Sequence, residues 1–286
     1  MPRKKLLVVC LLAAVLSIVV ILENHRGKYL RAYFLDVGQG DAAFIIFPCG
    51  RNMLVDGGDL RQDRTDIVRF LQKLRVRRID TVVLSHPHSD HLGGLLRVLE
   101  HFPVSLVIDS GYPHTTDIYI NFLEMVDRKD IPYQTAVRGN VLEGYRDVFI
   151  DFLNPPRTLY EGGSAVNNNS VAFIIRYKRT RFLFTGDIEN EAEGELVRVF
   201  GDNLRSDVLK VPHHGSRTSS TAEFLKAASP AVAVIQVGEN NRYGHPHLTV
   251  FERYESIGTR IFRTDTDGTV MVSTDGKKIT VKKSVN

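Results

Sequence analysis

Histidine and aspartate side chains gather in a few short segments of the sequence. Four of them fall within six positions of the segment SHPHSDHLGG, directly after an apolar run: His86, His88, Asp90 and His91. Imidazole and carboxylate groups are ligands of zinc, manganese and iron in proteins. Four such groups in one tight loop at a strand end predict a site that holds two metal ions side by side. The alternative, a solvated polar loop, has no need of four ligand types in this order.

A further carboxylate closes an apolar run later in the chain. The run FLFTGD ends at Asp187, which places this side chain at the edge of a predicted sheet. Taken alone, Asp187 is better explained as a turn residue or as the N-cap of a helix over IENEAEGEL. Because the histidine loop is present in the same chain, we interpret Asp187 as a carboxylate that bridges two metal ions.

Two more histidine pairs also follow apolar runs. The segment KVPHHGSRTSS carries His213 and His214, and YGHPHLTVFERY carries His245 and His247. Seven of the ten histidines therefore lie in three short clusters, each behind a predicted strand. Ser216 and the glycine before it offer hydroxyl and backbone donors that suit a phosphate or an oxyanion.

The elements that must position these clusters are those of a layered α/β domain. Apolar, β-rich runs predict strands within 32–38, 42–47, 51–58, 79–85, 104–110, 170–177, 181–187, 207–214 and 231–238. Helical spacing predicts helices near 64–76, 93–101, 117–129, 219–228 and 247–257. The end of the chain, 268–283, reads as a hairpin with an Asp-Gly turn, and 161–169 as a loop inside the domain. Strands with helices between them in both halves predict sheets covered by helices on their outer faces.

Composition excludes several classes of protein. Of the 286 residues, 43% are hydrophobic and 24% are charged, which is ordinary for a globular protein and excludes disordered and collagen-like chains. The two cysteines, Cys10 and Cys49, cannot form a disulfide framework. The net charge of +4 is too small to identify a nucleic-acid partner.

The N-terminal segment differs from the rest of the chain. Residues 6–22 carry no charge and follow Arg3, Lys4 and Lys5. As a helix this run would be ~25 Å long, near the lower limit for crossing a membrane. We interpret 1–27 as an uncleaved anchor, because no Ala-x-Ala site follows the run; a cleaved signal peptide is the alternative. Either interpretation places the single domain expected over 28–286 outside the cytoplasm.

The sequence resembles the metallo-β-lactamase superfamily, because HPHSDH matches its H-x-H-x-D-H motif and Asp187 falls where its bridging aspartate is expected. More closely, it is similar to the C-terminal hydrolase domain of ComEC, the DNA-uptake channel protein of naturally competent bacteria. That similarity rests on FLDVGQGDA, LVDGG, NNNSVAF, LFTGDIE, LKVPHHGS and GHPH, and it runs from about residue 30 to the end. It implies a four-layer αββα sandwich with the site at the rim between two sheets.

The resemblance also implies metal ligands. The first ion would be bound by His86 and His88, the second by Asp90 and His91, and Asp187 would bridge them. A late histidine completes the second site in the superfamily; His245 is our choice, with His247 as the fallback.

Other residues would act around these ligands. His213 and His214 would flank the metals as phosphate ligands or proton donors, or one of them would itself bind metal. With Asp90 and Asp187, they form the expected catalytic set. Asp41 would lie behind the ligands and orient an imidazole.

The sequence departs from the superfamily pattern at one ligand of the first metal. A third histidine is expected between the H-x-H-x-D-H loop and Asp187, but that interval holds only His101 and His114. The ComEC-like group carries NNNS instead, so the position is either empty or filled by a weak oxygen ligand. The candidates for that ligand are Asn167, Asn168 and Ser170. An oxygen-richer site shifts the preference slightly from zinc towards manganese.

Together these features predict hydrolysis of a phosphodiester with two divalent ions, Zn²⁺ or Mn²⁺. Lys210 and Ser216 would steady the phosphate charge. The expected substrate is DNA, single- or double-stranded, outside the cytoplasmic membrane, beside a separate competence channel or outside competence altogether. The alternatives are an extracellular phosphodiesterase acting on a small or cell-wall phosphoester and a non-catalytic DNA-binding surface module. The basic cluster of Lys73, Arg75, Arg77 and Arg78 is explained either by a grip on DNA or by a solvated helix end.

Overall fold

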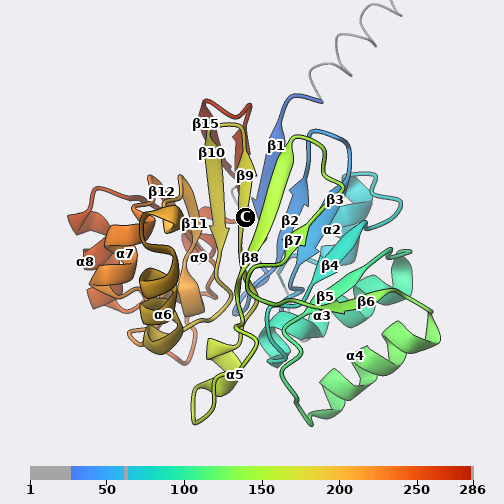
Figure 1. The fold of residues 1–286 in the computed structure, drawn as a ribbon. Coiled ribbons are helices and arrows are strands. Elements are labelled where there is room, and N and C mark those ends of the chain that lie inside the picture. Colours follow the sequence, from blue (N-terminus) through green and yellow to red (C-terminus); the bar gives the residue numbers. More distant parts are fainter. Residues whose placement is uncertain (1–26, 61–63, 285–286) are drawn as a thin grey trace, which may run out of the picture.

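The computed structural model describes residues 27–60 and 64–284. In this part of the chain two β-sheets lie face to face, and helices cover the outer face of each (Figure 1). The αββα sandwich predicted from the sequence is therefore confirmed. The predicted anchor over 1–27 lies outside the described residues, apart from its last residue. None of the helices that the structure describes has the length and apolar character needed to cross a membrane.

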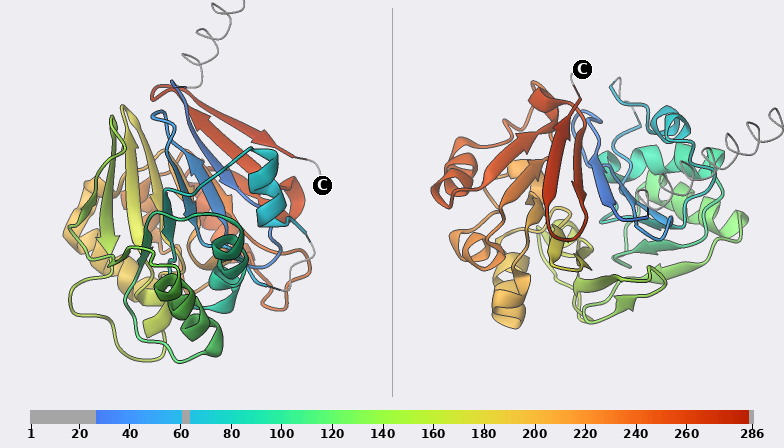
Figure 2. Two further views of the ribbon diagram at one scale, coloured as in Figure 1. Left: turned by 90° about the vertical axis from the view of Figure 1, so that its right-hand side faces the viewer. Right: turned by 90° about the horizontal axis from the view of Figure 1, so that it is seen from above.

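The first sheet has eight strands in the order β15-β14-β1-β2-β3-β4-β5-β6. Their bounds are β1 Leu30–Phe34, β2 Ala43–Ile46, β3 Asn52–Val55, β4 Thr81–Val83, β5 Val107–Asp109, β6 Tyr133–Thr135, β14 Val270–Thr274 and β15 Ile279–Lys283. Pairing is antiparallel from β15 to β3 and parallel from β3 to β6. The C-terminal hairpin thus adds to β1, the first strand of the sheet, as Figure 2 shows. Its helices are α2 Ile67–Lys73, α3 Ser89–His101 and α4 Asp117–Arg128.

The second sheet has seven strands in the order β13-β12-β11-β10-β9-β8-β7. Their bounds are β7 Val141–Leu142, β8 Val148–Asn154, β9 Ala172–Tyr177, β10 Thr180–Phe184, β11 Val208–Lys210, β12 Val232–Ile235 and β13 Arg260–Arg263. Its long helices are α6 Asn190–Phe200, α7 Ala222–Ala228 and α8 Leu248–Ser256. The short ones are α5 Ala165–Asn168, η1 Gly201–Leu204, η2 Pro212–Gly215 and α9 Thr264–Asp267.

Three apolar layers hold the sandwich together. Between the sheets, Phe184 stacks on Phe34 and on Phe173, with ring centroids 5.7 and 5.0 Å apart. Separate clusters of buried side chains fill the space between each sheet and its helices. Each buried aromatic or aliphatic side chain contributes roughly 1.5–3 kcal/mol relative to an exposed one, so the strands are fixed well enough to position a site at their ends.

The strand directions bring distant segments to one rim. Strands β10 to β13 are mutually parallel, and β4 is parallel to its neighbours β3 and β5. In such sheets ligands bind beyond the carboxyl ends of the strands. At this rim the Val171 amide donates to the Ser85 carbonyl oxygen at 2.8 Å, and the Gln236 side-chain amide donates to that of Ala42, also at 2.8 Å. These hydrogen bonds fix one sheet against the other where the predicted ligands lie.

Several elements differ from the sequence expectation. Helix α3 begins at Ser89 instead of near residue 93, so it includes part of the histidine loop. Strand β6 escaped prediction because all three of its residues are exposed and show no apolar alternation. Strands β7, β8 and β13 were also not predicted. The expected loop 161–169 contains the short helix α5.

Candidate metal centre

The first group of predicted ligands lies where β4 gives way to α3. His86 lies in the link, His88 is the N-cap of α3, and Asp90 and His91 belong to its first turn. The helical backbone therefore fixes the spacing of the last two ligands. The carboxylate of Asp90 also lies at the positive end of the helix dipole, which stabilises its charge.

The turn before Asp41 packs against this helix start. Gly40 has a φ of 128°, and a Cβ atom there would lie 2.1 Å from the backbone oxygen of Asp90. The backbone amide of Asp41 donates a hydrogen bond to the same oxygen at 3.1 Å. Only glycine permits both the conformation and this approach, so the GQGDA segment holds Asp41 directly behind the ligands.

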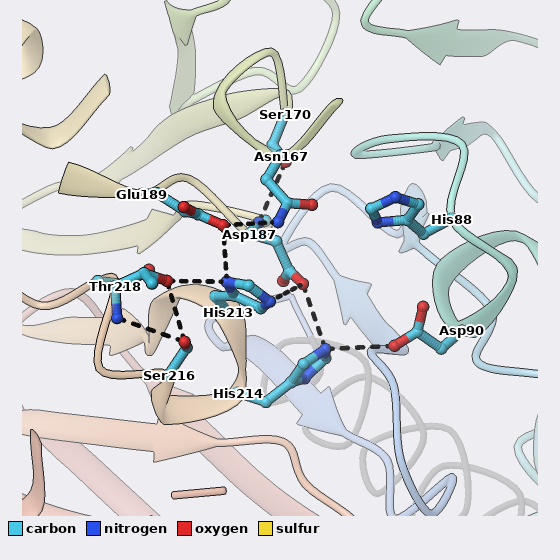
Figure 3. Close-up of polar contacts among 12 residues, drawn as sticks. His88, Asp90, Asn167, Ser170, Asp187, Glu189, His213, His214, Ser216 and Thr218 are labelled. Carbon is cyan, nitrogen blue, oxygen red and sulfur yellow. Dashed lines mark hydrogen bonds and ion pairs between the residues drawn. The ribbon is translucent and has the colours of Figure 1, made fainter. Parts of the chain in front are cut away.

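Asp187 lies at the centre of the cluster. Its Oδ2 atom is 3.3 Å from the Nε2 atom of His91 and 3.3 Å from the Nε2 atom of His214 (Figure 3). The same His214 nitrogen is 3.5 Å from the carboxylate of Asp90. Ligand atoms of Asp90, His91 and His214 can therefore surround one ion, as can those of His86, His91 and Asp187. His88 lies on the His86 side of the cluster, because its Nδ1 atom is 2.9 Å from the Nε2 atom of His86.

The hydrogen bonds of two imidazoles leave one nitrogen atom of each ring available to a metal ion. The Nδ1 atom of His91 lies 3.0 Å from Asp56 Oδ2, and that of His214 lies 2.9 Å from the carbonyl oxygen of Gln236. With both protons on Nδ1, each Nε2 atom carries a lone pair. Both Nε2 atoms are buried and find no hydrogen-bond partner among the described residues. Buried nitrogens in this state, aimed at a shared carboxylate, are what metal ligation requires.

The charges of the cluster support the same assignment. Burial opposes the ionisation of Asp187, but the imidazoles of His214 and His91 outweigh it and hold the pKa of Asp187 well below its ordinary value. Burial lowers the pKa of His91, but Asp187 and Asp56 reverse the effect and hold that pKa well above its ordinary value. Burial, with the neighbouring His91, lowers the pKa of His86 well below its ordinary value, so His86 is neutral and free to bind metal. The carboxylates of Asp56 and Asp187 on either side of His91 thus supply the negative charge that a bound cation would neutralise.

Lys210 takes a different place from the one expected for a phosphate ligand. Its side chain is 3% exposed, and its ammonium forms an ion pair with Asp41. It also donates to the Gly186 carbonyl oxygen at 2.9 Å and lies 3.4 Å from Asp187 Oδ1. Lys210 therefore neutralises the carboxylates from behind and does not line the cavity. Asp41, in turn, lies 3.3 Å from the Nδ1 atom of His214, where it can orient that ring.

The two adjacent histidines of η2 point in different directions because their backbone is left-handed. His213 and His214 have φ values of 48° and 53°, a conformation that costs a non-glycine residue roughly 1–2 kcal/mol. This strain turns His214 inward to Asp187, while His213 lies beside Glu189 with an Nδ1–Oε1 distance of 3.4 Å. Strain of this kind is characteristic of functional sites. Ser216, just behind them, is buried and bonds to Thr218 at 2.9 Å, so its hydroxyl group does not line the cavity.

The late histidines lie farther from the bridging carboxylate. The His245 ring is 6.3 Å from that of His214 and 5.7 Å from that of His213, and it lines the cavity. Burial, with the neighbouring His214, lowers the pKa of His245 to about 4, so the ring is neutral. His247 accepts a hydrogen bond from the Arg217 amide at 3.2 Å and does not line the cavity. The geometry thus favours His214 over His245 in the second site.

Of the three residues proposed as the missing ligand of the first metal, one has a free oxygen. Asn168 Oδ1 accepts from the Glu189 amide, and the Ser170 hydroxyl accepts from the Asp187 amide. Asn167 donates to Glu189 at 2.8 Å, but its own Oδ1 atom is buried with no hydrogen-bond partner in the described part of the chain. Figure 3 shows Asn167 on the same side of Asp187 as His88.

The two histidines between the loop and Asp187 lie elsewhere. His101 is exposed at the end of α3 and bonds to the Arg97 carbonyl oxygen at 2.7 Å. The His114 ring lies 6.3 Å from that of His88, but its Nδ1 atom bonds to Thr116 at 2.9 Å.

Three residues of the site were not singled out from the sequence. Asp56 lies in the LVDGG segment and orients His91, Glu189 ends the LFTGDIE segment and contacts His213, and Gln236 supplies a backbone oxygen to His214. Asp56 and Glu189 lie in segments that carry the resemblance to the ComEC group, so their place in these segments could have identified them as site residues. A backbone carbonyl such as that of Gln236 leaves no signature in residue type.

Comparisons with known proteins show the family and the fold of this chain. The family model described as "Metallo-beta-lactamase superfamily" matches residues 35–239. The chain is 31% identical over 256 residues to ComE operon protein 3 of Bacillus subtilis (strain 168), across 82% of this chain and 32% of that protein. It is 32% identical over 236 residues to Competence protein ComA of Neisseria gonorrhoeae, across 82% of this chain and 30% of that protein. The chain thus spans about a third of the length of these relatives.

Solved structures share the fold at low sequence identity. Igni18, a metallo hydrolase from Ignicoccus hospitalis KIN4/I, matches with a TM-score of 0.54 and 17% identity, over 85% of this chain and 98% of that one. The metallo-beta-lactamase fold protein YhfI from Bacillus subtilis matches with a TM-score of 0.56 and 11% identity, over 86% of this chain and 100% of that one.

Proposed function

Because the chain belongs to the metallo-β-lactamase superfamily, in which it is a ComEC-like hydrolase domain, we propose that it is a metal-dependent phosphodiesterase that cleaves DNA outside the cytoplasmic membrane. The observation that carries the proposal is the position of Asp187 between two buried imidazoles. His91 and His214 aim unbonded Nε2 atoms at its Oδ2 atom, each from 3.3 Å. A binding module has no use for buried nitrogens that lack hydrogen bonds, since each costs free energy to desolvate.

The residues that would hold the ions divide into two sets. His86, His88 and the free oxygen of Asn167 would hold the first, and Asp90, His91 and His214 the second, with Asp187 shared between them. When bound, two divalent ions neutralise phosphate charge and lower the pKa of a water molecule so that it can attack phosphorus.

The chain's own residues orient the substrate and manage protons. Glu189 faces the Nδ1 atom of His213, which leaves the Nε2 atom of His213 on the side of Asp187, 3.9 Å from its carboxylate. With both ring nitrogens protonated, the His213 Nε2 atom would donate a hydrogen bond to a phosphate oxygen or its proton to the leaving oxygen, and Glu189 would stabilise the charge of the imidazolium. Because His214 would bind the second metal ion, His213 alone would act as the proton donor.

The relatives support DNA as the substrate. They are named for competence, and the segments that this chain shares with the ComEC group include the metal-site residues. The predicted N-terminal anchor supports a location outside the cytoplasmic membrane, beside a separate channel protein. A phosphodiesterase acting on a small or cell-wall phosphoester is the second candidate, because the cavity over the site has a volume of only ≈ 260 Å³.

One experiment separates these functions. The full chain is incubated with plasmid DNA, single-stranded DNA and bis-p-nitrophenyl phosphate, across Mn²⁺ and Zn²⁺ series. Asp187→Asn is the inactive variant. The matched control is Asp151→Asn on β8, which removes an ion pair to Arg176 on β9. We expect cleavage of DNA by the wild type and by Asp151→Asn but not by Asp187→Asn.

Each of the other outcomes excludes the two-metal site or selects another function. DNA cleavage that survives Asp187→Asn rules out the two-metal site. Hydrolysis of the small diester with DNA left intact selects the second candidate. Binding of DNA and metal with no hydrolysis of either substrate selects a non-catalytic DNA-binding module.

A further inference from the structure

We propose that Tyr243 and Arg242 form a subsite for the nucleobase that flanks the scissile phosphate, so that the preferred substrate is a strand with an unpaired base. The inference rests on the proposed nuclease function and specifies its substrate. It begins from an exposed aromatic ring at the edge of a polar site: Tyr243 is 48% exposed.

Tyr243 separates two neighbouring cavities. One, of ≈ 260 Å³, is lined by the metal-site residues Asp90, Asp187 and His214. The other, of ≈ 390 Å³, lies against Asp59, Asn241 and Arg242. Tyr243 and Asp90 line both. A nucleotide with its phosphate in the first cavity would therefore place its base against the Tyr243 ring.

The loop that carries Tyr243 is fixed at its base by Asn241. The Asn241 side-chain amide donates to the carbonyl oxygens of Gly238, at 3.0 Å, and His245, at 2.6 Å. Its oxygen accepts from the amides of Tyr243, at 3.2 Å, and His245, at 3.0 Å. A ring held in place in this way loses little further freedom when a ligand stacks on it.

The Tyr243 ring lies beside a histidine, and its hydroxyl group bonds to an arginine. It stacks on the His245 ring with a centroid distance of 5.6 Å and an angle of 24°. The Arg242 guanidinium carbon lies 4.9 Å from the Tyr243 centroid, and its Nη2 atom donates to the hydroxyl group at 2.7 Å. Aromatic rings and guanidinium planes are the two groups on which single-stranded nucleic acids stack their bases.

The chemistry of the second cavity fits a base better than a phosphate. Its lining includes the acidic residue Asp59 and the amide residues Gln39 and Asn241. Carboxylates repel a phosphate but accept hydrogen bonds from the exocyclic amino groups of bases. The phosphate belongs in the neighbouring cavity, where the metal ligands lie.

The basic cluster of residues 73–78, for which the sequence suggests contacts with DNA, lies too far from the metal centre to bind the base next to the scissile phosphate. Arg75, Arg77 and Arg78, which precede β4, line a surface cavity with residues at the start of β3, such as Asn52. The metal ligands follow the carboxyl end of β4. A DNA strand bound by these arginines would therefore lie at the amino ends of β3 and β4, whereas the metal centre lies beyond the carboxyl end of β4.

The test measures binding and stacking separately. The full chain, in detergent with Zn²⁺, is titrated with a single-stranded DNA hexamer whose phosphorothioate linkages slow cleavage and whose central base is 2-aminopurine. Anisotropy gives the Kd, and quenching of 2-aminopurine reports stacking. The variants are Tyr243→Leu and Tyr243→Phe. Phe149→Leu is the matched control, because Phe149 is 57% exposed and lies under the Arg176 guanidinium on another face.

We expect Tyr243→Leu to weaken binding about 5- to 150-fold and to abolish quenching, since stacking on one aromatic ring contributes roughly 1–3 kcal/mol per base. Tyr243→Phe and Phe149→Leu should behave as wild type. A hexamer with an abasic residue in place of 2-aminopurine should bind Tyr243→Leu and wild type equally, because it has no base to stack. For unmodified DNA, Tyr243→Leu should raise KM by the same factor as Kd.

Two results would overturn the subsite: wild-type binding and quenching by Tyr243→Leu, or an equal loss of affinity for the abasic hexamer. If either is found while wild type cleaves DNA, the nuclease function stands and only the subsite fails. If wild type hydrolyses bis-p-nitrophenyl phosphate but neither binds nor cleaves DNA, the proposed nuclease function fails first and the subsite with it.

Discussion

Asp56 accepts a hydrogen bond from His91: its Oδ2 atom lies 3.0 Å from the Nδ1 atom of the ring, and both side chains are buried. The other carboxylate oxygen accepts the Ser85 amide at 2.7 Å, which fixes the orientation of Asp56. This arrangement holds the His91 proton on Nδ1 and directs the Nε2 lone pair at Asp187. Asp56, which would touch neither metal nor substrate, thus fixes the tautomer in which His91 can bind a metal ion.

Asp56→Asn should therefore weaken metal binding. The amide keeps the shape of the side chain and tolerates the left-handed backbone at this position, where φ is 58°. It loses the carboxylate that holds the His91 tautomer. We expect Zn²⁺ affinity, measured by competition with a chelating dye, to fall about 10- to 100-fold. Asp151→Asn serves as the control, and an affinity of Asp56→Asn equal to that of the control would contradict the role given to Asp56.

The choice between His214 and His245 as the late ligand can be decided by counting metal ions. His214 lies 3.3 Å from Asp187 and 3.5 Å from Asp90, whereas His245 contacts neither carboxylate within ion-pair distance. We expect His214→Ala to lose one bound ion, measured by plasma mass spectrometry after dialysis. His245→Ala should keep the full complement of ions. Loss of an ion from His245→Ala with His214→Ala unchanged would restore the assignment made from the resemblance.

The contact of Gly40 with Asp90 predicts a large cost for a single methyl group. A Cβ atom at Gly40 would lie 2.1 Å from the Asp90 backbone oxygen, so Gly40→Ala must displace the start of α3. The matched control is Gly50→Ala, because Gly50 also has a positive φ, 86°, but nothing within 4 Å of its added Cβ. Backbone strain alone costs roughly 1–3 kcal/mol. We expect urea unfolding to show a loss in that range for Gly50→Ala and a larger one, with weakened metal binding, for Gly40→Ala. Equal losses would contradict the close contact.

The main strands and half of the site could be predicted from the sequence because they are local patterns. The run of β12, for example, is apolar throughout, since both faces of the strand are buried. The ligands His86 to His91 are neighbours in the chain, so their spacing alone brings them together. Asp187 could be assigned because it ends such a run. In contrast, β6 packs no side chain into the core and carries no pattern to detect.

The remaining contacts of the site arise from packing between distant segments. The choice of His214 over His245 depends on two consecutive left-handed residues, His213 and His214, which bring His214 Nε2 to within 3.3 Å of Asp187. Lys210 is the last residue of β11, within the expected strand, but its ammonium pairs with Asp41 in the connection between β1 and β2 of the other sheet. Neither outcome follows from residue type or spacing, because each depends on how the sheets meet.

A buried glutamate away from the metal ligands predicts how stability depends on pH. Glu193 on α6 is buried and accepts the backbone amides of Ser220, at 2.6 Å, and Thr221, at 2.8 Å. Burial raises its pKa to about 7, from an ordinary value of 4.5, because these hydrogen bonds only partly offset the loss of water around the charge. The folded state therefore binds this proton more tightly than the unfolded state. The stability that the proton contributes is fully present below pH 4.5 and is lost as the pH rises through 7.

Glu193→Gln should remove this dependence, since an amide does not titrate. The histidines of the site also titrate in this range, so the quantity to measure is the difference in unfolding free energy between variant and wild type, at pH 5 and at pH 8. We expect this difference to shift by about 2–3 kcal/mol in favour of the variant at the higher pH. The control is Glu252→Gln on α8, an exposed glutamate whose substitution should leave the difference constant. A constant difference for Glu193→Gln as well would show that Glu193 is ionised throughout, with its charge balanced by the two amides and Arg253.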